Sequence, residues 1–172
     1  MNAVVVTISD SCFAGQREDR SGPAVATRLR HAGFAVEGIL TVPDDLDEIV
    51  TILRQQAAGN RLIVTTGGTG ITPRDVTPEA TRTACERVLE GFGERMRSEG
   101  AKQTPFAAMS RAVSGTLGKC LIVNVPGNPK AAVHSLEAVL HLIPHALALL
   151  SGDTRHPEEP HDEASRDSRN VR

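Results

Sequence analysis

The most chemically suggestive feature of this 172-residue chain is an acidic residue set in a glycine- and proline-rich loop. Residues 64–80 read VTTGGTGITPRDVTPEA, so an apolar run ends at Gly67, Gly68 and Gly70, and Asp75 follows between two prolines. Glycines let backbone N–H groups approach an anion without a Cβ in the way. The stretch is neither a Walker A sequence nor a dinucleotide-binding G-x-G-x-x-G sequence. It predicts a phosphate site, while the glycines alone are equally consistent with a simple tight turn.

A second acidic pair, Asp44 and Asp45, follows another apolar segment. One of these carboxylates and Asp75 could together hold Mg²⁺ bridged to nucleotide phosphates, because Mg²⁺ typically takes one or two carboxylates plus substrate oxygens. Lys130 and Arg74 could offset charge on a phosphoryl group during transfer. A simpler interpretation also fits the spacing, in which Asp44 or Asp45 caps the helix that follows.

Two other sets of side chains give weaker predictions. His134, His141 and His145 recur on one helical stripe, as metal ligands would, but Pro144 interrupts it and no Cys or acid is spaced to complete the ligand shell. We therefore expect partly exposed helix histidines. Cys12 could be a nucleophile, but no His lies near it in the sequence to activate it, which favours a small loop residue.

The elements that carry these residues alternate between strand and helix patterns. Strands are predicted at residues 3–8, 35–42, 62–66 and 120–125, with helices at 21–33, 46–57, after Pro78, at 91–102, and as one long final helix after residues 126–131. Repeated β-α-β order indicates an α/β fold with a mostly parallel sheet and helices on both faces. Ligands bind beyond the carboxyl ends of such strands, where the loops at residues 9–22, 67–75 and 126–131 should meet.

Composition argues against several classes of partner. Lys and Arg number 19 against 21 acids and the pI is about 6.3, so no basic field attracts nucleic acid. The only aromatic residues are four Phe, which leaves no Tyr or Trp platform for stacking bases. The most apolar window, residues 131–150, contains one Glu, three His and one Pro, which argues against a membrane span. We expect neither a nucleic-acid nor a membrane partner.

The chain is predicted to form one domain over residues 1–152, followed by a disordered polar tail at residues 153–172. That tail contains six acids, four Arg and almost nothing apolar, so it cannot offset the entropy lost on ordering. Cys12, Cys85 and Cys120 are an odd number without C-x-x-C spacing, and the first residues lack a signal-peptide pattern. Reduced thiols and a cytoplasmic location are therefore expected.

Several motifs occur together in a recognisable order. The stretches TTGGTGITPRDVTPEAT, GFGERMR, the Ser110-Arg111 pair and NVPGNPKA resemble the molybdopterin-binding MoaB/Mog family, which is related to the G domains of plant and animal molybdenum-cofactor proteins. The resemblance runs from about residue 4 to residue 152. It implies an α/β fold of a particular kind, a three-layer α/β/α sandwich with a mostly parallel central sheet, usually assembled as a homotrimer.

The resemblance also implies an activity in molybdenum cofactor biosynthesis. It indicates a molybdopterin adenylyltransferase, a nucleotidyltransferase that uses Mg²⁺ and ATP to adenylylate molybdopterin, giving adenylyl-molybdopterin and pyrophosphate. The product would be handed to a molybdenum insertase. One alternative is a non-catalytic molybdopterin-binding or carrier protein of the same family. Another is a flavodoxin-like electron carrier, which the absence of Trp and Tyr disfavours.

Site residues follow from the resemblance by position. Asp44 and Asp75 fall on two functionally essential aspartates of the family and are predicted as catalytic residues and as ligands of Mg²⁺. The residues predicted to bind nucleotide and pterin are Ser9, Asp10, Ser11, Gly15, Thr66, Gly67, Gly68, Thr69, Gly70, Arg74, Ser110, Arg111, Pro126, Gly127, Asn128 and Lys130.

Overall fold

The computed structural model describes residues 1–153, so the predicted disordered tail lies outside the described residues apart from Asp153. The strands are β1 (Asn2–Ile8), β2 (Ala35–Val42), β3 (Leu62–Thr66), β4 (Arg87–Val88), β5 (Ser114–Leu117) and β6 (Cys120–Val125). The helices are α1 (Asp10–Phe13), α2 (Ser21–His31), α3 (Leu46–Ala57), α4 (Thr77–Ala84), α5 (Glu90–Ala101), α6 (Pro129–Leu140) and α7 (Ile143–Leu150), with a 3₁₀ helix η1 (Pro105–Met109).

All six strands form one sheet in the order β2-β1-β3-β6-β5-β4. β1 pairs in parallel with β2 and β3, and β3 pairs in parallel with β6. β5 runs antiparallel to both β6 and β4. The carboxyl ends of the four parallel strands therefore meet at one edge of the sheet, which is where the sequence places the candidate loops.

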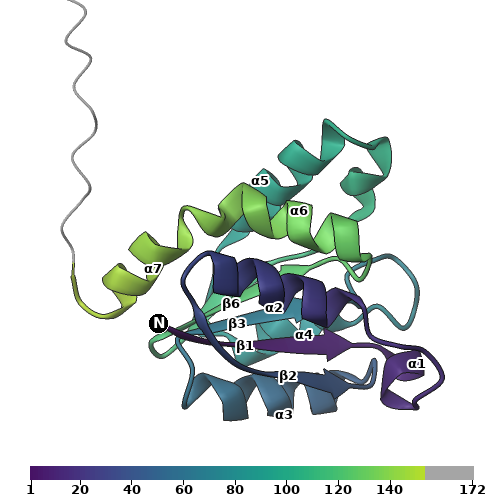
Figure 1. Ribbon diagram of the computed structural model, residues 1–172, viewed down its shortest axis with the longest axis horizontal. Coiled ribbons are helices and arrows are strands. Elements are labelled where there is room, and N and C mark those ends of the chain that lie inside the picture. Colours follow the sequence, from purple (N-terminus) through teal and green to yellow (C-terminus); the bar gives the residue numbers. More distant parts are fainter. Residues whose placement is uncertain (154–172) are drawn as a thin grey trace, which may run out of the picture.

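Helices cover both faces of this sheet (Figure 1). On one face α2, α5, α6 and α7 pack around a core that includes Leu29, Leu136 and Ile143. On the other face α3 and α4 pack around a second core that includes Leu53 and Ala80. All five of these side chains are fully buried. This confirms the α/β fold, a three-layer α/β/α sandwich with a mostly parallel central sheet.

The prediction of one long final helix is wrong, because the chain forms two helices there. α6 ends at Leu140, and α7 begins at Ile143 after a bend of 59°. Pro144 lies in the first turn of α7, where its missing N–H costs nothing, whereas in a continuous helix its ring would clash with the carbonyl of Leu140. Within residues 1–153 no single helix is long and apolar enough to cross a membrane, and α6 and α7 pass that test only as a bent pair.

A buried polar network joins β6 to β3 and α4. Asn124 is fully buried, and its Nδ2 donates to Thr65 Oγ1 and to Thr81 Oγ1, each at 2.9 Å. Its Oδ1 accepts a hydrogen bond from Val113 N at 3.4 Å. One side chain thus satisfies two hydroxyls and a backbone amide that water does not reach.

Replacing Asn124 with Ala should lower the free energy of unfolding by about 2–4 kcal/mol, because the hydroxyls of Thr65 and Thr81 lose their donor and a small cavity remains. Urea unfolding monitored by circular dichroism measures this change. Thr83→Ala, an exposed substitution on α4, is the control and should shift stability by less than about 0.5 kcal/mol. Equal stability of the two variants would show that the network contributes nothing.

Candidate functional site

A cavity of about 1060 Å³ lies at the edge where β1, β3 and β6 end. The predicted site residues that line it are Ser9, Asp44, Thr66, Gly67, Gly68, Thr69, Gly70, Asp75, Ser110, Pro126, Gly127, Asn128 and Lys130. The predicted site residues outside its lining are Asp10, Ser11, Gly15, Arg74 and Arg111. The structure therefore brings both proposed catalytic carboxylates to one cavity and leaves four polar residues of the predicted site outside its lining.

Asp44 is held in place by reciprocal hydrogen bonds with Asp10. Asp10 N donates to Asp44 Oδ2 at 2.8 Å, and Asp44 N donates to Asp10 Oδ1 at 3.0 Å. Burial raises the pKa of the Asp44 carboxyl, and the charge of Asp10 adds to this, against the opposing effect of the hydrogen bond from the Asp10 amide. Asp44 Oδ1 accepts no hydrogen bond from the described residues, so this atom is available to a ligand in the cavity.

Helix capping is the role of the neighbouring Asp45 and not of Asp44. Asp45 Oδ1 accepts hydrogen bonds from Asp47 N at 3.0 Å and Glu48 N at 3.1 Å, at the start of α3. The capping interpretation of this acidic pair is therefore correct for one member, and the other faces the cavity.

Arg74 supports this acidic group from outside the cavity. Its Nε and Nη2 donate to both carboxylate oxygens of Asp10 at 2.8–3.0 Å. The Asp44 amide and then the Arg74 guanidinium hold the pKa of Asp10 below its usual range. A bidentate pair of this kind fixes both groups, so Arg74 neutralises Asp10, which in turn orients Asp44.

Asp75 sits in a turn that its own backbone closes. Asp75 N donates to Thr72 O at 3.0 Å, and Asp75 Oδ2 accepts from Thr72 N at 2.8 Å. Burial alone would raise the pKa of Asp75, but hydrogen bonds from Thr72 and from the Gly70 amide, together with the charge of Arg111, keep it below its usual range. Asp75 is therefore a fixed and ionised carboxylate at neutral pH.

The glycine turn brings the two carboxylates to the same short loop. Gly67 has φ +104°, and a Cβ there would lie 2.2 Å from the carbonyl oxygen of Ile8. A Cβ on Gly68 would lie 3.2 Å from Asp44 Oδ1, and one on Gly70 would lie 2.9 Å from Asp75 Oδ2. The tight-turn interpretation is thus correct for Gly67, and both carboxylates lie beside the loop at residues 68–70.

Arg111 clamps the loop that carries Asp75. Its backbone N donates to Thr69 O at 2.9 Å, and its Nε donates to Gly70 O at 2.6 Å. The two Nη atoms donate to Glu79 and to the carbonyl oxygen of Asp75. Each nitrogen of the guanidinium thus has an acceptor, and Arg111, which is not part of the cavity lining, positions Asp75.

Arg111→Lys should speed amide hydrogen exchange at residues 71–75 by about tenfold, since one ammonium group cannot replace three acceptor contacts and each lost charged hydrogen bond is worth about 1.5 kcal/mol. Mass spectrometry of exchanged peptides gives the rate. Arg82→Lys is the matched control, because Arg82 forms an exposed pair with Glu90. Unchanged exchange in the Arg111 variant would mean that the clamp does not order the loop.

Comparison with known proteins identifies the family. Residues 4–145 match the family model described as a probable molybdopterin binding domain. The chain belongs to the MoaB/Mog family of molybdenum cofactor biosynthesis proteins. It is 39% identical over 167 residues to a molybdopterin adenylyltransferase of Helicobacter pylori strain J99, with 94% of each protein covered. It is also 39% identical to the molybdenum cofactor synthesis protein cinnamon of Drosophila melanogaster, matching 92% of this chain but 27% of that longer protein.

Solved structures support the same family. The structure of MoaB from Thermus thermophilus superposes with a TM-score of 0.83 at 46% identity, covering 88% of this chain and 96% of that one. A structure of MogA gives a TM-score of 0.83 at 33% identity, covering 87% of this chain and 99% of that one. The fold and the order of the loops described above are therefore those of the MoaB/Mog family.

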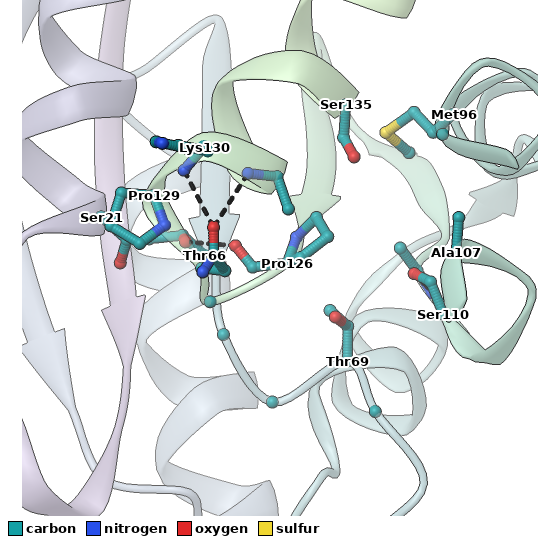
Figure 2. A pocket seen from close by; sticks show the side chains of 18 of the residues that line it. Ser21, Thr66, Thr69, Met96, Ala107, Ser110, Pro126, Pro129, Lys130 and Ser135 are labelled. Atoms are coloured by element: carbon teal, nitrogen blue, oxygen red, sulfur yellow. Dashed lines mark hydrogen bonds between the residues drawn. The ribbon is translucent and has the colours of Figure 1, made fainter. Parts of the chain in front are cut away.

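The far wall of the cavity was not predicted from the family motifs. It comes from α5 and η1, whose side chains include Met96, Phe106 and Met109. Figure 2 shows Met96 and Ala107 on one side of the cavity, opposite the side that carries Lys130. Phe106 is 71% exposed and Met109 47% exposed, so large apolar side chains border a polar loop. Met96 belongs to the GFGERMR motif, but neither that motif nor the PFAAM segment of η1 indicates that these side chains line the cavity.

Two further lining residues, Arg17 and Ser21, were also missed. They lie in the 9–22 loop, which the sequence placed at the correct edge of the sheet without indicating which of its side chains turn inward.

Asp44 and Asp75 both line the cavity and are the residues that would hold Mg²⁺, whereas the histidines of residues 1–153 do not form a metal site. Within residues 1–153 no group of three or more His, Cys, Asp or Glu side chains could hold a metal ion. His141 is exposed, and His134 and His145 are half-buried, as the sequence predicts. Asp44 and Asp75 supply only two ligands, which suits Mg²⁺ because it retains water and takes further oxygens from substrate phosphates.

Proposed function

We propose that this protein is a molybdopterin adenylyltransferase, which joins AMP from ATP to molybdopterin in molybdenum cofactor biosynthesis. The observation that carries the proposal is the convergence of Asp44 and Asp75 on the glycine loop inside one large cavity. A volume near 1060 Å³ is at the upper end for small-molecule sites and has room for two substrates. The names of the Helicobacter pylori and Haemophilus influenzae relatives, both molybdopterin adenylyltransferases, support it.

In the proposed reaction the terminal phosphate of molybdopterin attacks the α-phosphorus of ATP. A new bond forms between that phosphate oxygen and the α-phosphorus, and the bond from the α-phosphorus to the oxygen that bridges to the β-phosphorus breaks. Pyrophosphate leaves with the electron pair. The protein need not supply a nucleophile, because holding the two phosphates in line and stabilising their charge accounts for the catalysis of such transfers.

Each part of the site has a role in this scheme. Mg²⁺ held by Asp44 and Asp75 would neutralise charge on the nucleotide phosphates. The Thr69 hydroxyl, which lines the cavity, would donate to a phosphate oxygen. At the start of α6, Asn128 Oδ1 accepts from Lys130 N at 3.1 Å and Ala131 N at 3.2 Å, which caps the helix and leaves the lining Lys130 ammonium for an anion.

Pyrophosphate release from Mg-ATP, measured with and without molybdopterin, tests the proposal. We expect release that requires both molybdopterin and Mg²⁺. Molybdopterin that raises the unfolding temperature without any release would instead support the carrier function, since a ligand that binds only the native state must stabilise it. Assembly as a homotrimer and hand-over to a molybdenum insertase stay predictions.

A further inference from the structure

One basic side chain of the cavity, Arg17, has no role in the scheme above. It lies between α1 and α2 and lines the cavity. Its Nη2 donates to Ser9 Oγ at 3.1 Å. Ser9 is only 7% exposed and also accepts from Cys12 N at 3.3 Å. The guanidinium of this cavity-lining residue is therefore anchored to a buried hydroxyl at the end of β1.

Three other arginines near the cavity are already engaged. Arg74 is bound to Asp10, and the guanidinium of Arg111 contacts Glu79 and two backbone carbonyls. Arg97 Nη1 donates to two backbone carbonyls at 3.0 and 3.3 Å. Arg74 and Arg111 lie outside the cavity lining, and Arg97 lines the cavity but has its Nη1 held by two backbone carbonyls.

Arg17 and Lys130 differ from those three arginines. Both line the cavity, and within residues 1–153 neither forms an ion pair with a carboxylate. Figure 2 shows Lys130 and Ser21 on the side of the cavity opposite Met96. Ser21 is the first residue of α2, shortly after Arg17 in the sequence, and is 6% exposed. Among residues 1–153 the cavity lining thus offers two cations without a carboxylate partner, together with the nearly buried hydroxyls of Ser9 and Ser21.

We infer that Arg17 and Lys130 form the subsite for the phosphate monoester of the acceptor, separate from the Mg-nucleotide position at Asp44 and Asp75. The inference rests on the proposed function and adds the placement of one substrate. A phosphate monoester carries a charge of about −1.5 to −2 at pH 7. The carboxylate side repels such a group unless a metal intervenes, whereas two cations match its charge. The nucleotide, which brings Mg²⁺, takes the acidic side.

The first test uses glycerol 3-phosphate as a simple monoester probe in metal-free buffer at low ionic strength, with calorimetry of the native protein, Arg17→Gln and Arg20→Gln. Arg20 is a matched control because it belongs to the same loop, pairs with Glu18 and does not line the cavity. We expect Kd to rise about tenfold or more in Arg17→Gln, the loss of one charge-assisted hydrogen bond, and to stay within about twofold in Arg20→Gln. If both variants bind glycerol 3-phosphate equally more weakly than the native protein, or if neither does, the inference is overturned.

The second test separates the subsite from the proposed function. With adenylyl transfer as the readout, Arg17→Gln should raise KM for molybdopterin about tenfold and leave KM for ATP unchanged. A rise in KM for ATP alone would assign Arg17 to the nucleotide and contradict the inference. If the monoester binds through Arg17 but no adenylyl-molybdopterin forms, the subsite stands and the proposed function fails. If transfer proceeds with both KM values unchanged in Arg17→Gln, the function stands and the subsite fails.

Discussion

Replacing Asp75 with Asn should lower the rate of adenylyl-molybdopterin formation by about 100-fold or more, the scale of loss when one preorganised electrostatic group is removed. The amide is nearly isosteric with the carboxylate, and its oxygen can still accept the hydrogen bond from Thr72 N that closes the turn. The fold should therefore persist while the charge that would hold Mg²⁺ is lost. Initial rates at saturating Mg-ATP and molybdopterin measure the effect, and thermal unfolding checks the fold.

Asp47→Asn is the matched control for that experiment. Asp47 is an exposed acid in the first turn of α3 and does not line the cavity. We expect its rate to stay within about twofold of native, since exposed charges outside a site contribute little. Near-native turnover of Asp75→Asn with its dependence on Mg²⁺ intact would contradict the assignment of Asp75.

Gly67→Ala should lower the free energy of unfolding by about 3 kcal/mol or more. The added Cβ would lie 2.2 Å from the carbonyl oxygen of Ile8, which belongs to the backbone of β1 and cannot rotate away, and φ is +104°. Gly15→Ala separates the two causes, because Gly15 also has a positive φ of +69° but has nothing within 4 Å of the new Cβ. The control should lose only about 1–2 kcal/mol.

Urea unfolding of both glycine variants gives the comparison. A loss for Gly67→Ala no larger than the loss for Gly15→Ala would show that the close approach of the turn to β1 is not what requires glycine at position 67.

The alternating α/β order could be predicted because the central strands are buried on both faces and read as continuous apolar runs. Every residue of β3 is buried, and the predicted strands at 3–8, 35–42, 62–66 and 120–125 agree with β1, β2, β3 and β6 to within one residue. β4 and β5 could not be predicted from such patterns. β4 has two residues, and Gly115 in β5 is needed because a Cβ there would lie 2.6 Å from Cys85 Sγ, a contact set by tertiary packing.

The candidate site, like the fold, could be predicted from the sequence only in part. Asp44 lies just after β2 and Asp75 lies in the loop between β3 and α4, so the carboxyl-edge rule places both without knowledge of packing. The contacts of Arg74 could not be predicted, because its partner Asp10 is 64 residues away in the sequence. The wall from α5 and η1 likewise depends on how α5 packs on α6, which no local pattern encodes.

The most direct test of adenylyl transfer follows the α-phosphate of ATP. The native protein would be incubated with molybdopterin, Mg²⁺ and ATP labelled at the α-phosphorus or, in a parallel reaction, at the γ-phosphorus, and the products separated by chromatography. The account predicts that the α label moves to the pterin and the γ label leaves in pyrophosphate, in equal amounts. Molybdopterin recovered without the α label, from a protein that binds it, would contradict the account.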